Sequence, residues 1–198
     1  MKLVRYIPYS ITERLLTIMH FRNISRSKIS FTKILGAIIL NKRLERDGYT
    51  LSNYGVWMVN RGYDRTFQAS ILGYRNKLEK IISSIKEPTT FIDIGANQGV
   101  FSLVAAANQS VIKIHSFEPN LKICNFLQLN FAVNNVSKYE IHKVAISTKE
   151  SKTKFFVSEN HSGAGKISSS ESNMTVRSVN HLYLNSKISE AHTTIFVK

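Results

Sequence analysis

An apolar segment that runs directly into a glycine-bearing turn constrains the fold of this chain more than any other feature. Residues 91–99 have the sequence Phe-Ile-Asp-Ile-Gly-Ala-Asn-Gln-Gly. The run Thr90–Ile94 predicts a short buried strand, and residues 98–107 predict the helix that follows it. Gly95 permits a sharp turn and a close approach between backbone and ligand, while Gly99 permits close packing of the helix on the strand. Because the amino end of such a helix offers unpaired amides, the segment predicts a nucleotide-binding turn.

An acidic residue ends the next predicted strand, Val111–Glu118. Pro119 fixes the exit from this strand, and Asn120 is a favourable N-cap for a further helix. A carboxylate at that strand end can accept hydrogen bonds from both hydroxyls of a ribose. Asp93, at the carboxyl end of the first strand, can accept a hydrogen bond from an ammonium group. This order of elements predicts a parallel, Rossmann-like α/β sheet with a nucleotide site at its carboxyl edge.

The turn favours S-adenosylmethionine over a nicotinamide or flavin dinucleotide. The dinucleotide fingerprint is G-x-G-x-x-G, in which the second glycine lets the backbone approach a pyrophosphate. Asn97 occupies the place of that second glycine, and Asp93 precedes the turn. S-adenosylmethionine has no pyrophosphate, and its amino group is a donor that the aspartate can accept.

The pattern divides the chain into two regions, 1–88 and 89–198. The first region is predicted to be mostly helical, with helices over residues 10–19, 31–46 and 67–85 and a short hairpin within 49–62. The second is the predicted cofactor-binding core. Its later segments are predicted as a third strand over Tyr139–Ile146, a further strand over Lys154–Val157, an exposed loop over 158–178 and an apolar strand over 193–197.

Positive charge is concentrated in the first region. The whole chain carries a net charge of +14. Sixteen basic and six acidic residues fall within 1–88, which leaves +4 for the rest of the chain. A basic surface of this kind could contact nucleic acid, an anionic glycan or a membrane surface, or could be a solvated face without a partner.

Neither a membrane span nor a metal site is predicted. The longest apolar run, Ile34–Leu40, has seven residues, whereas a helix needs roughly 20 to cross a bilayer. No signal-peptide pattern is present at the amino end, so the sequence predicts a soluble, cytoplasmic protein. Cys124 is the only cysteine and is predicted to be a core residue. The six histidines are scattered along the chain without metal-ligand spacing, so no metal ligand is expected.

Several side chains outside the turn are candidates without a defined role. Five histidines could each act as a general base, but no partner is recognisable along the sequence, and a surface or packing role is the alternative for each: His115, His142, His161, His181 and His192. The segment 161–165, His-Ser-Gly-Ala-Gly, could approach a substrate or could simply turn the chain. The aromatic and arginine residues between 54 and 75 could stack on a sugar or base, or could pack the first region on the core.

Residues from about 89 to 198 resemble the FkbM family of S-adenosylmethionine-dependent methyltransferases. The resemblance rests on four stretches: Phe-Ile-Asp-Ile-Gly-Ala-Asn-Gln-Gly-Val-Phe-Ser-Leu at 91–103, Ser-Phe-Glu-Pro-Asn at 116–120, Leu-Gln-Leu-Asn-Phe-Ala-Val-Asn-Asn at 127–135 and Val-Ala-Ile-Ser at 144–147. The first two stretches together are fairly specific, and the other two are supportive.

The resemblance implies a class I methyltransferase fold that binds S-adenosylmethionine. It implies that the turn residues surround the methionine moiety, that Glu118 binds the ribose and that residues 144–145 lie near the adenine. The cofactor-binding residues implied are Asp93, Gly95, Ala96, Asn97, Gly99, Glu118 and Pro119. Members of the family are associated with O-methylation of sugars, glycan parts and secondary metabolites, so the expected acceptor is a hydroxyl of a saccharide or another small molecule.

One departure from the family pattern leaves the catalytic residues unassigned. After a strand like residues 195–198, the family continues with an aspartate, a further acid and a glycine, whereas this sequence ends at Lys198. The core is therefore expected to be incomplete at its carboxyl end. Two alternatives stay open: a truncated, inactive remnant or cofactor-binding module, and a nucleic-acid methyltransferase. The charge favours the nucleic-acid alternative, but the chain lacks the Asn/Asp-Pro-Pro-Tyr/Phe signature of amine-methylating enzymes.

Overall fold

The structure is a computed structural model that describes residues 5–6, 48–62, 64–73, 76–168, 170–189 and 194–198. The chain forms two compact units, residues 1–74 and residues 75–198. The helices predicted over residues 10–19 and 31–46 lie outside the described residues.

The first unit contains the predicted hairpin. Strands β2 and β3 pair antiparallel, and β1 pairs with β2 in parallel to give the order β1-β2-β3. A helix follows, and the Asp64 side chain caps its start by accepting a hydrogen bond from the amide of Phe67 at 2.8 Å. The elements are β1 (Arg5–Tyr6), β2 (Tyr49–Leu51), β3 (Trp57–Val59) and α3 (Arg65–Leu72).

The single helix predicted over residues 67–85 is wrong, because two helices occupy this stretch. Helix α3 ends at Gly73, which adopts a left-handed conformation with φ of 74°. Helix α4 (Asn76–Ser83) belongs to the second unit, so the boundary between units precedes the one expected at residue 88. The side-chain amide of Asn108 anchors the end of α4 by donating to the carbonyls of Ile82 and Ile85.

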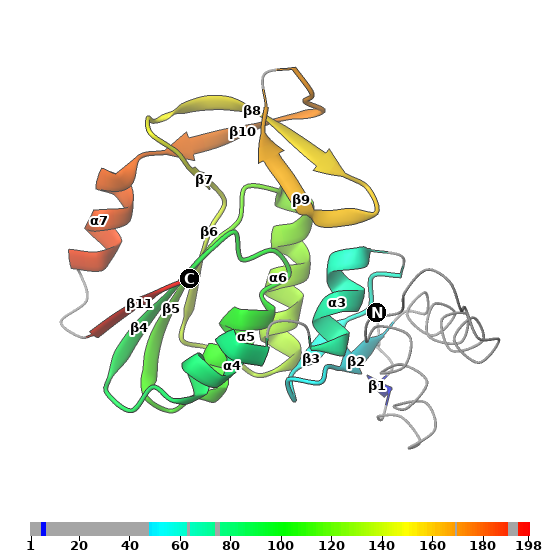
Figure 1. The fold of residues 1–198 in the computed structure, drawn as a ribbon, viewed down its shortest axis with the longest axis vertical. Coiled ribbons are helices and arrows are strands. Elements are labelled where there is room, and N and C mark those ends of the chain that lie inside the picture. The colour runs from blue at the N-terminus through cyan, green and yellow to red at the C-terminus, as the bar shows by residue number, and fades with distance from the viewer. Residues whose placement is uncertain (1–4, 7–47, 63, 74–75, 169, 190–193) are drawn as a thin grey trace. The chain divides into compact units, whose positions relative to one another are not determined.

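The second unit is built on a four-stranded sheet in which every pair of neighbouring strands is parallel (Figure 1). The strand order is β11-β4-β5-β6, so the first strand of the unit lies between the second and the last. This is the 3-2-1-4 order of Rossmann-like folds, and it confirms the predicted fold class. The elements are β4 (Thr89–Ile94), α5 (Val100–Ala107), β5 (Val111–Phe117), α6 (Leu121–Val133), β6 (Tyr139–His142) and β11 (Thr194–Val197).

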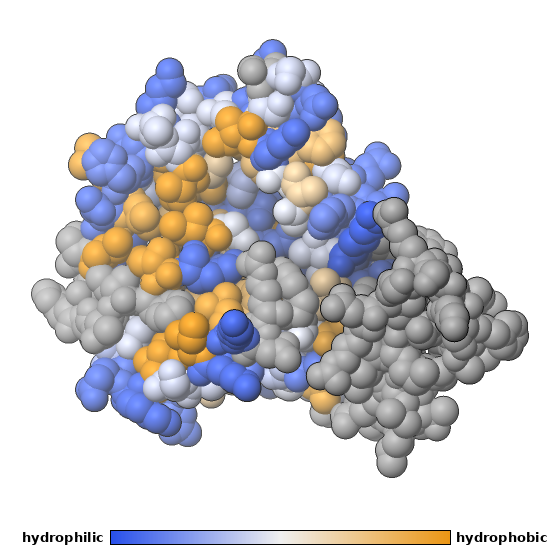
Figure 2. All heavy atoms as spheres, in the orientation of Figure 1, coloured by the Kyte–Doolittle hydropathy of each residue, from blue (hydrophilic) through white to orange (hydrophobic). Residues whose placement is uncertain are grey.

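Two faces of this sheet are covered by different helices. Ser102 of α5 lies against one face, where its hydroxyl contacts Asp93 and Ser116. On the opposite face, Ile92 and Phe117 form a buried cluster against which α7 (His181–Ser189) packs through Tyr183 and neighbouring apolar residues. The alternation of residues 92 and 93, and of 116 and 117, between faces is the expected pleat of a strand. Figure 2 shows apolar residues gathered over the region of α7.

The predicted third strand over Tyr139–Ile146 is wrong in one respect, because it divides into two strands. The amide of Val144 donates to the carbonyl of His142 at 2.9 Å, which turns the chain after β6. Strand β7 (Ala145–Ile146) then joins a second sheet with the order β7-β10-β8-β9, in which β8 is Ser151–Ser158, β9 is His161–Ile167 and β10 is Met174–Val179.

The exposed loop predicted over residues 158–178 is also wrong, because most of it forms strands of this second sheet. The strands are β8 (Ser151–Ser158), β9 (His161–Ile167) and β10 (Met174–Val179), and β8 pairs antiparallel with both of its neighbours. Glycine in β9 serves packing here: a Cβ added at Gly165 would lie 2.8 Å from the ring of Phe155. The small residues of this stretch therefore allow an aromatic side chain to cover the strand.

No described helix is long and apolar enough to span a bilayer.

Candidate functional site

Asp93 lies at the carboxyl end of β4 with its side chain fully buried. One carboxylate oxygen accepts a hydrogen bond from the Ser102 hydroxyl at 2.7 Å, and the other pairs with the Lys198 ammonium at 2.7 Å. Ser116 lies 2.8 Å from the same serine hydroxyl, which extends the polar chain to β5. The environment therefore keeps a buried carboxylate in place and presents an oxygen to an ammonium group.

Two side chains that were not predicted from the sequence, Ser102 and Lys198, hold Asp93. Ser102 was detectable as a polar residue in the otherwise apolar helix segment Val-Phe-Ser-Leu-Val-Ala-Ala-Ala at 100–107. Lys198 gave no such signal, because it reaches Asp93 only through the parallel pairing of β11 with β4. Its ammonium also lies 3.5 Å from the carbonyl oxygen of Gly95.

The turn after β4 is fixed by backbone geometry. Gly95, Asn97 and Gly99 all have positive φ values, of 70°, 52° and 82°. The amides of Gly95 and Ala96 both donate to the carbonyl oxygen of Phe117, at 3.0 and 2.9 Å, and so fasten the turn to the end of β5. The result is a rigid turn between the carboxyl ends of two neighbouring parallel strands, which is where ligands bind in sheets of this type.

The two glycines of the turn have different surroundings. A Cβ added at Gly95 would have no heavy atom within 4 Å, so this position is open. A Cβ added at Gly99 would lie 2.1 Å from Cδ1 of Leu127 in α6. Gly99 therefore permits close packing, as predicted, but its close neighbour is a side chain of the next helix rather than a strand.

Glu118 follows β5 directly and is 6% exposed. One carboxylate oxygen accepts the amide of Asn97 at 3.0 Å, and the other accepts the amide of Asn120 at 2.9 Å. Burial raises the pKa of Glu118, while these two amide hydrogen bonds act in the opposite direction. Each carboxylate oxygen has a second lone pair, so the group retains the capacity to accept further hydrogen bonds from a ligand.

The second sheet reaches the turn through β9. The Ser162 hydroxyl donates to the side-chain oxygen of Asn97 at 3.1 Å, and the same oxygen accepts the amide of Gln98 at 2.9 Å. Ser162 belongs to the 161–165 segment that was expected to lie in a loop, and it is a contact that sequence analysis did not assign. The contact joins the two sheets beside the candidate site.

The remaining residues implied by the resemblance lie close to these groups in the chain. Ala96 is buried within the turn, and Pro119 is half-buried between Glu118 and the cap of α6. Val144 is buried in the cluster with Ile92 and Phe117 on the α7 face of the sheet. The structure thus brings the turn and both carboxylates to one edge of the sheet and places residue 144 in the core beside it.

Two of the histidines that had no recognisable partner are each other's neighbours. His115 of β5 and His142 of β6 are buried, and their Nδ1 and Nε2 atoms lie 3.0 Å apart. His161 and His181 are exposed, and His192 lies outside the described residues. Both members of the pair lie on the α7 face, so they do not contact the Asp93 carboxylate directly.

Comparison with known proteins gives a family but no close relative. A family model described as Vibrio cholerae RfbT protein matches residues 57–189. No FkbM match accompanies it, so the FkbM resemblance has no support from this comparison. A search of curated proteins gives no significant match.

The matches among solved structures include three proteins, each aligned with about half of this chain. P. horikoshii TYW2 in complex with MeSAdo has 18% identity and a TM-score of 0.38, covering 50% of this chain and 36% of that one. M. jannaschii TYW2 in complex with AdoMet has 15% identity and a TM-score of 0.37, covering 50% and 49%. The M. jannaschii tRNA m1G37 methyltransferase has 16% identity and a TM-score of 0.37, covering 52% and 34%.

This chain therefore spans about half or less of the length of these three structures. The family match, in contrast, includes all of the candidate site residues from Asp93 to Ser162 and extends over well more than half of the chain. The chain belongs to the family described as Vibrio cholerae RfbT protein.

Proposed function

We propose that the second unit binds S-adenosylmethionine at the carboxyl edge of β4 and β5 and transfers its methyl group to a hydroxyl. The observation that carries this proposal is the pair of buried carboxylates, Asp93 and Glu118, on either side of a turn that is open at Gly95. The cofactor is a sulfonium compound that supplies an electrophilic methyl group when it is bound. Its ammonium and its ribose hydroxyls are donors, and the two carboxylates are acceptors of matching chemistry.

The contacts of Asp93 support its assignment to the ammonium end of the cofactor. Its outer oxygen already accepts an ammonium, that of Lys198, at 2.7 Å. The Ser102 hydroxyl holds the other oxygen, so the carboxylate cannot rotate freely. Because Asp93 is fully buried, the cofactor ammonium would take the place of Lys198 at this oxygen, and the carboxylate itself would not have to reorient.

The contacts of Glu118 support its assignment to the ribose. Amides on both sides fix the plane of this carboxylate, at 3.0 Å from Asn97 and 2.9 Å from Asn120. Two oxygens held in this way can accept two neighbouring hydroxyls at once. Gly95 would leave room for the ligand, because a Cβ added there would meet no heavy atom within 4 Å apart from those of Gly95 and its two chain neighbours.

We further propose that the acceptor is a hydroxyl of a saccharide or another small molecule. We place the reaction in the cytoplasm, where the cofactor is made. The support is the FkbM-like pattern of residues 91–103 and 116–120. Displacement at a sulfonium methyl depends mainly on the position and alignment of the nucleophile, so a dedicated base is optional. No base is assigned.

Cofactor binding is tested by isothermal titration of the full chain with S-adenosylmethionine. We expect Asp93→Ala and Glu118→Ala each to weaken binding about 10- to 100-fold, since each removes charge-assisted hydrogen bonds of about 1.5–3 kcal/mol. Glu87→Ala is the matched control, because this exposed acid precedes β4 at the opposite end of the strand. An absence of binding by the parent chain, or an equal loss in all three variants, would contradict the proposal.

The net charge of +14 favours one alternative acceptor, a nucleic acid. Transfer of a labelled methyl group from S-adenosylmethionine is measured with oligosaccharides and with RNA under the same conditions. Transfer to oligosaccharide alone supports the proposal. Methylation of RNA, with binding that weakens steeply as salt rises, would establish the alternative instead. Cofactor binding without transfer to either class would identify a cofactor-binding module.

A further inference from the structure

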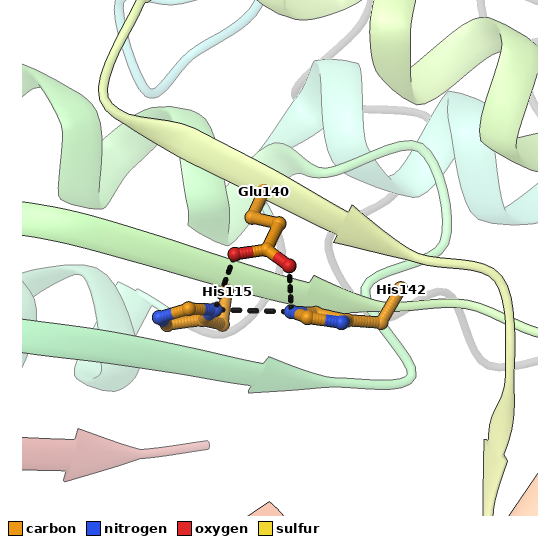
Figure 3. A group of neighbouring side chains, drawn as sticks. All are labelled: His115, Glu140 and His142. Atoms are coloured by element: carbon orange, nitrogen blue, oxygen red, sulfur yellow. Dashed lines mark hydrogen bonds and ion pairs between the residues drawn. The ribbon is translucent and has the colours of Figure 1, made fainter. Parts of the chain in front are cut away.

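Three potential metal ligands converge on the α7 face of the core sheet, away from the Asp93 carboxylate. They are His115 on β5 and Glu140 and His142 on β6 (Figure 3). In the parallel register His115 lies opposite Glu140, and Phe117 lies opposite His142. Because alternate residues of a strand share a face, all three side chains project from the same side of the sheet.

This cluster contains one contact at hydrogen-bond distance, between the two rings, and two longer contacts to the carboxylate. The His115 Nδ1 and His142 Nε2 atoms are 3.0 Å apart. One oxygen of Glu140 lies 3.6 Å from the first nitrogen, and the other oxygen lies 3.6 Å from the second. A separation of 3.6 Å is too long for a hydrogen bond. The carboxylate therefore faces both nitrogens at ion-pair distance rather than at hydrogen-bond distance, as Figure 3 shows.

These separations suit three ligands of one ion. Zinc binds histidine nitrogen and carboxylate oxygen at about 2.0–2.2 Å, so two ligands at a tetrahedral angle are separated by roughly 3.3–3.6 Å. The two nitrogens are 3.0 Å apart, and each lies 3.6 Å from a different oxygen of Glu140, so these values approach this range for a carboxylate that binds through both oxygens. When one atom of each residue is considered, the three ligand atoms lie within 4.8 Å of one another, and rotation of the Glu140 side chain would bring one oxygen to bonding distance.

The surroundings of His142 also suit a ligand, because its ring is buried. Its other nitrogen, Nδ1, lies 3.2 Å from the Tyr183 hydroxyl of α7. When Nδ1 carries the proton and donates it to this hydroxyl, the Nε2 lone pair points toward His115 and Glu140. Metal-binding histidines are oriented in this way by a partner on the second ring nitrogen.

We propose that His115 Nδ1, His142 Nε2 and the Glu140 carboxylate form a site for a divalent transition-metal ion of the zinc type. Two histidines and one glutamate are a known ligand set for zinc, with a fourth position left for water. Both rings are buried, whereas the Glu140 side chain is 42% exposed and gives the ion access from solvent. The ion would join β5 to β6. Its ligand His115 precedes Glu118 by three residues, and the amide of Glu118 donates to the carbonyl of the ligand His142.

One nearby cation competes for Glu140. The Lys113 ammonium lies 4.0 Å from its carboxylate, and both side chains are about half exposed. An exposed pair of this kind contributes little stability, and the long lysine side chain can turn into solvent. Replacing Lys113 by a divalent ion as the partner of Glu140 therefore costs little free energy. The inference does not depend on the methyltransferase proposal, because it rests on a different set of residues.

The experiment is a titration of the metal-free full chain with Co²⁺, followed by displacement with Zn²⁺. Cobalt in a tetrahedral nitrogen and oxygen site absorbs visible light, so the spectrum reports binding directly. We expect one ion per chain, and we expect Zn²⁺ to abolish the absorption by replacing Co²⁺. Glu140→Gln and His142→Ala should remove the absorption, and Tyr183→Phe should weaken binding by at least about tenfold through the lost ring orientation.

His181→Ala is the matched control, since this exposed histidine begins α7 outside the cluster. Glu140→Gln changes a half-exposed side chain, so we expect this variant to fold like the parent chain. Circular dichroism verifies the fold of the variant. The proposal stands if the absorption is lost in Glu140→Gln and retained in His181→Ala. A parent chain without stoichiometric Co²⁺ binding would overturn it, and so would an unchanged affinity in folded Glu140→Gln.

Discussion

The two glycines of the turn should respond very differently to the same substitution. Both have positive φ values, 70° at Gly95 and 82° at Gly99, so alanine at either position costs about 1–2 kcal/mol of backbone strain. Only at Gly99 does the new methyl group also meet a neighbour, 2.1 Å from Cδ1 of Leu127. Overpacking of this kind costs about 1–3 kcal/mol more. We therefore expect Gly99→Ala to destabilise the chain by about 2–5 kcal/mol and Gly95→Ala by about 1–2 kcal/mol.

Urea unfolding followed by far-ultraviolet circular dichroism measures both losses. With a slope of about 2 kcal/mol per molar urea, the midpoint of Gly99→Ala should fall by about 1–2.5 M, against less than about 1 M for Gly95→Ala. Cofactor affinity should respond at Gly95 even though the fold tolerates the change there. Gly95→Ala places a methyl group in the open space beside the turn, so it should weaken S-adenosylmethionine binding while the fold persists.

A double substitution separates the steric cost from the backbone cost. Leu127→Ala removes the atom that the new methyl group would meet, so Gly99→Ala should cost about 1–3 kcal/mol less in that background than alone. If Gly99→Ala destabilised the chain no more than Gly95→Ala, the close contact with α6 would be wrong. Strict additivity with Leu127→Ala would refute the same reasoning.

Two further predictions concern the buried polar groups of the sheet. Ser102→Ala removes the hydroxyl that contacts both Asp93 and Ser116, so we expect a loss of about 1–3 kcal/mol in urea unfolding, with Ser83→Ala on the exposed side of α4 as a neutral control. For the metal-free chain, the folded-state pKa of His142 is about 4 against 6.5 unfolded, so the unfolded state binds the extra proton between these values. Stability should therefore fall by about 3 kcal/mol as pH drops from 6.5 to 4. His142→Phe should lack this component of the pH slope, and an identical slope in parent and variant would show that the ring does not titrate as inferred.

The features that were predictable from the sequence are those encoded within a few consecutive residues. The apolar strand before Gly95, the helix after Gly99 and the N-cap at Asn120 are all present as expected, because each depends on local propensity and turn geometry. Local patterns were thus sufficient for the parallel core and for the positions of the two acids.

What could not be predicted depends on pairing between distant segments. Gly165 favours a loop when only its neighbours in the chain are considered, but in the structure it lies under the Phe155 ring and belongs to a strand. His115 and His142 showed no metal-ligand spacing because they meet only through the register of β5 with β6. The i, i+2 spacing of Glu140 and His142 on a strand was the one available signal, and it required knowledge of the face that each strand presents.

The contacts that close the candidate site also imply an order of events during folding. The Glu118–Asn97, Ser162–Asn97 and Lys198–Asp93 hydrogen bonds span 21, 65 and 105 residues of chain. Contacts between distant residues are costly to form early, because the loop between them must close first. The turn should therefore acquire its final rigidity only after β9 and β11 have joined their sheets. In hydrogen exchange, the Asn97 amide, which donates to Glu118 at the end of β5, should then report the assembly of the core sheet rather than the local formation of α5.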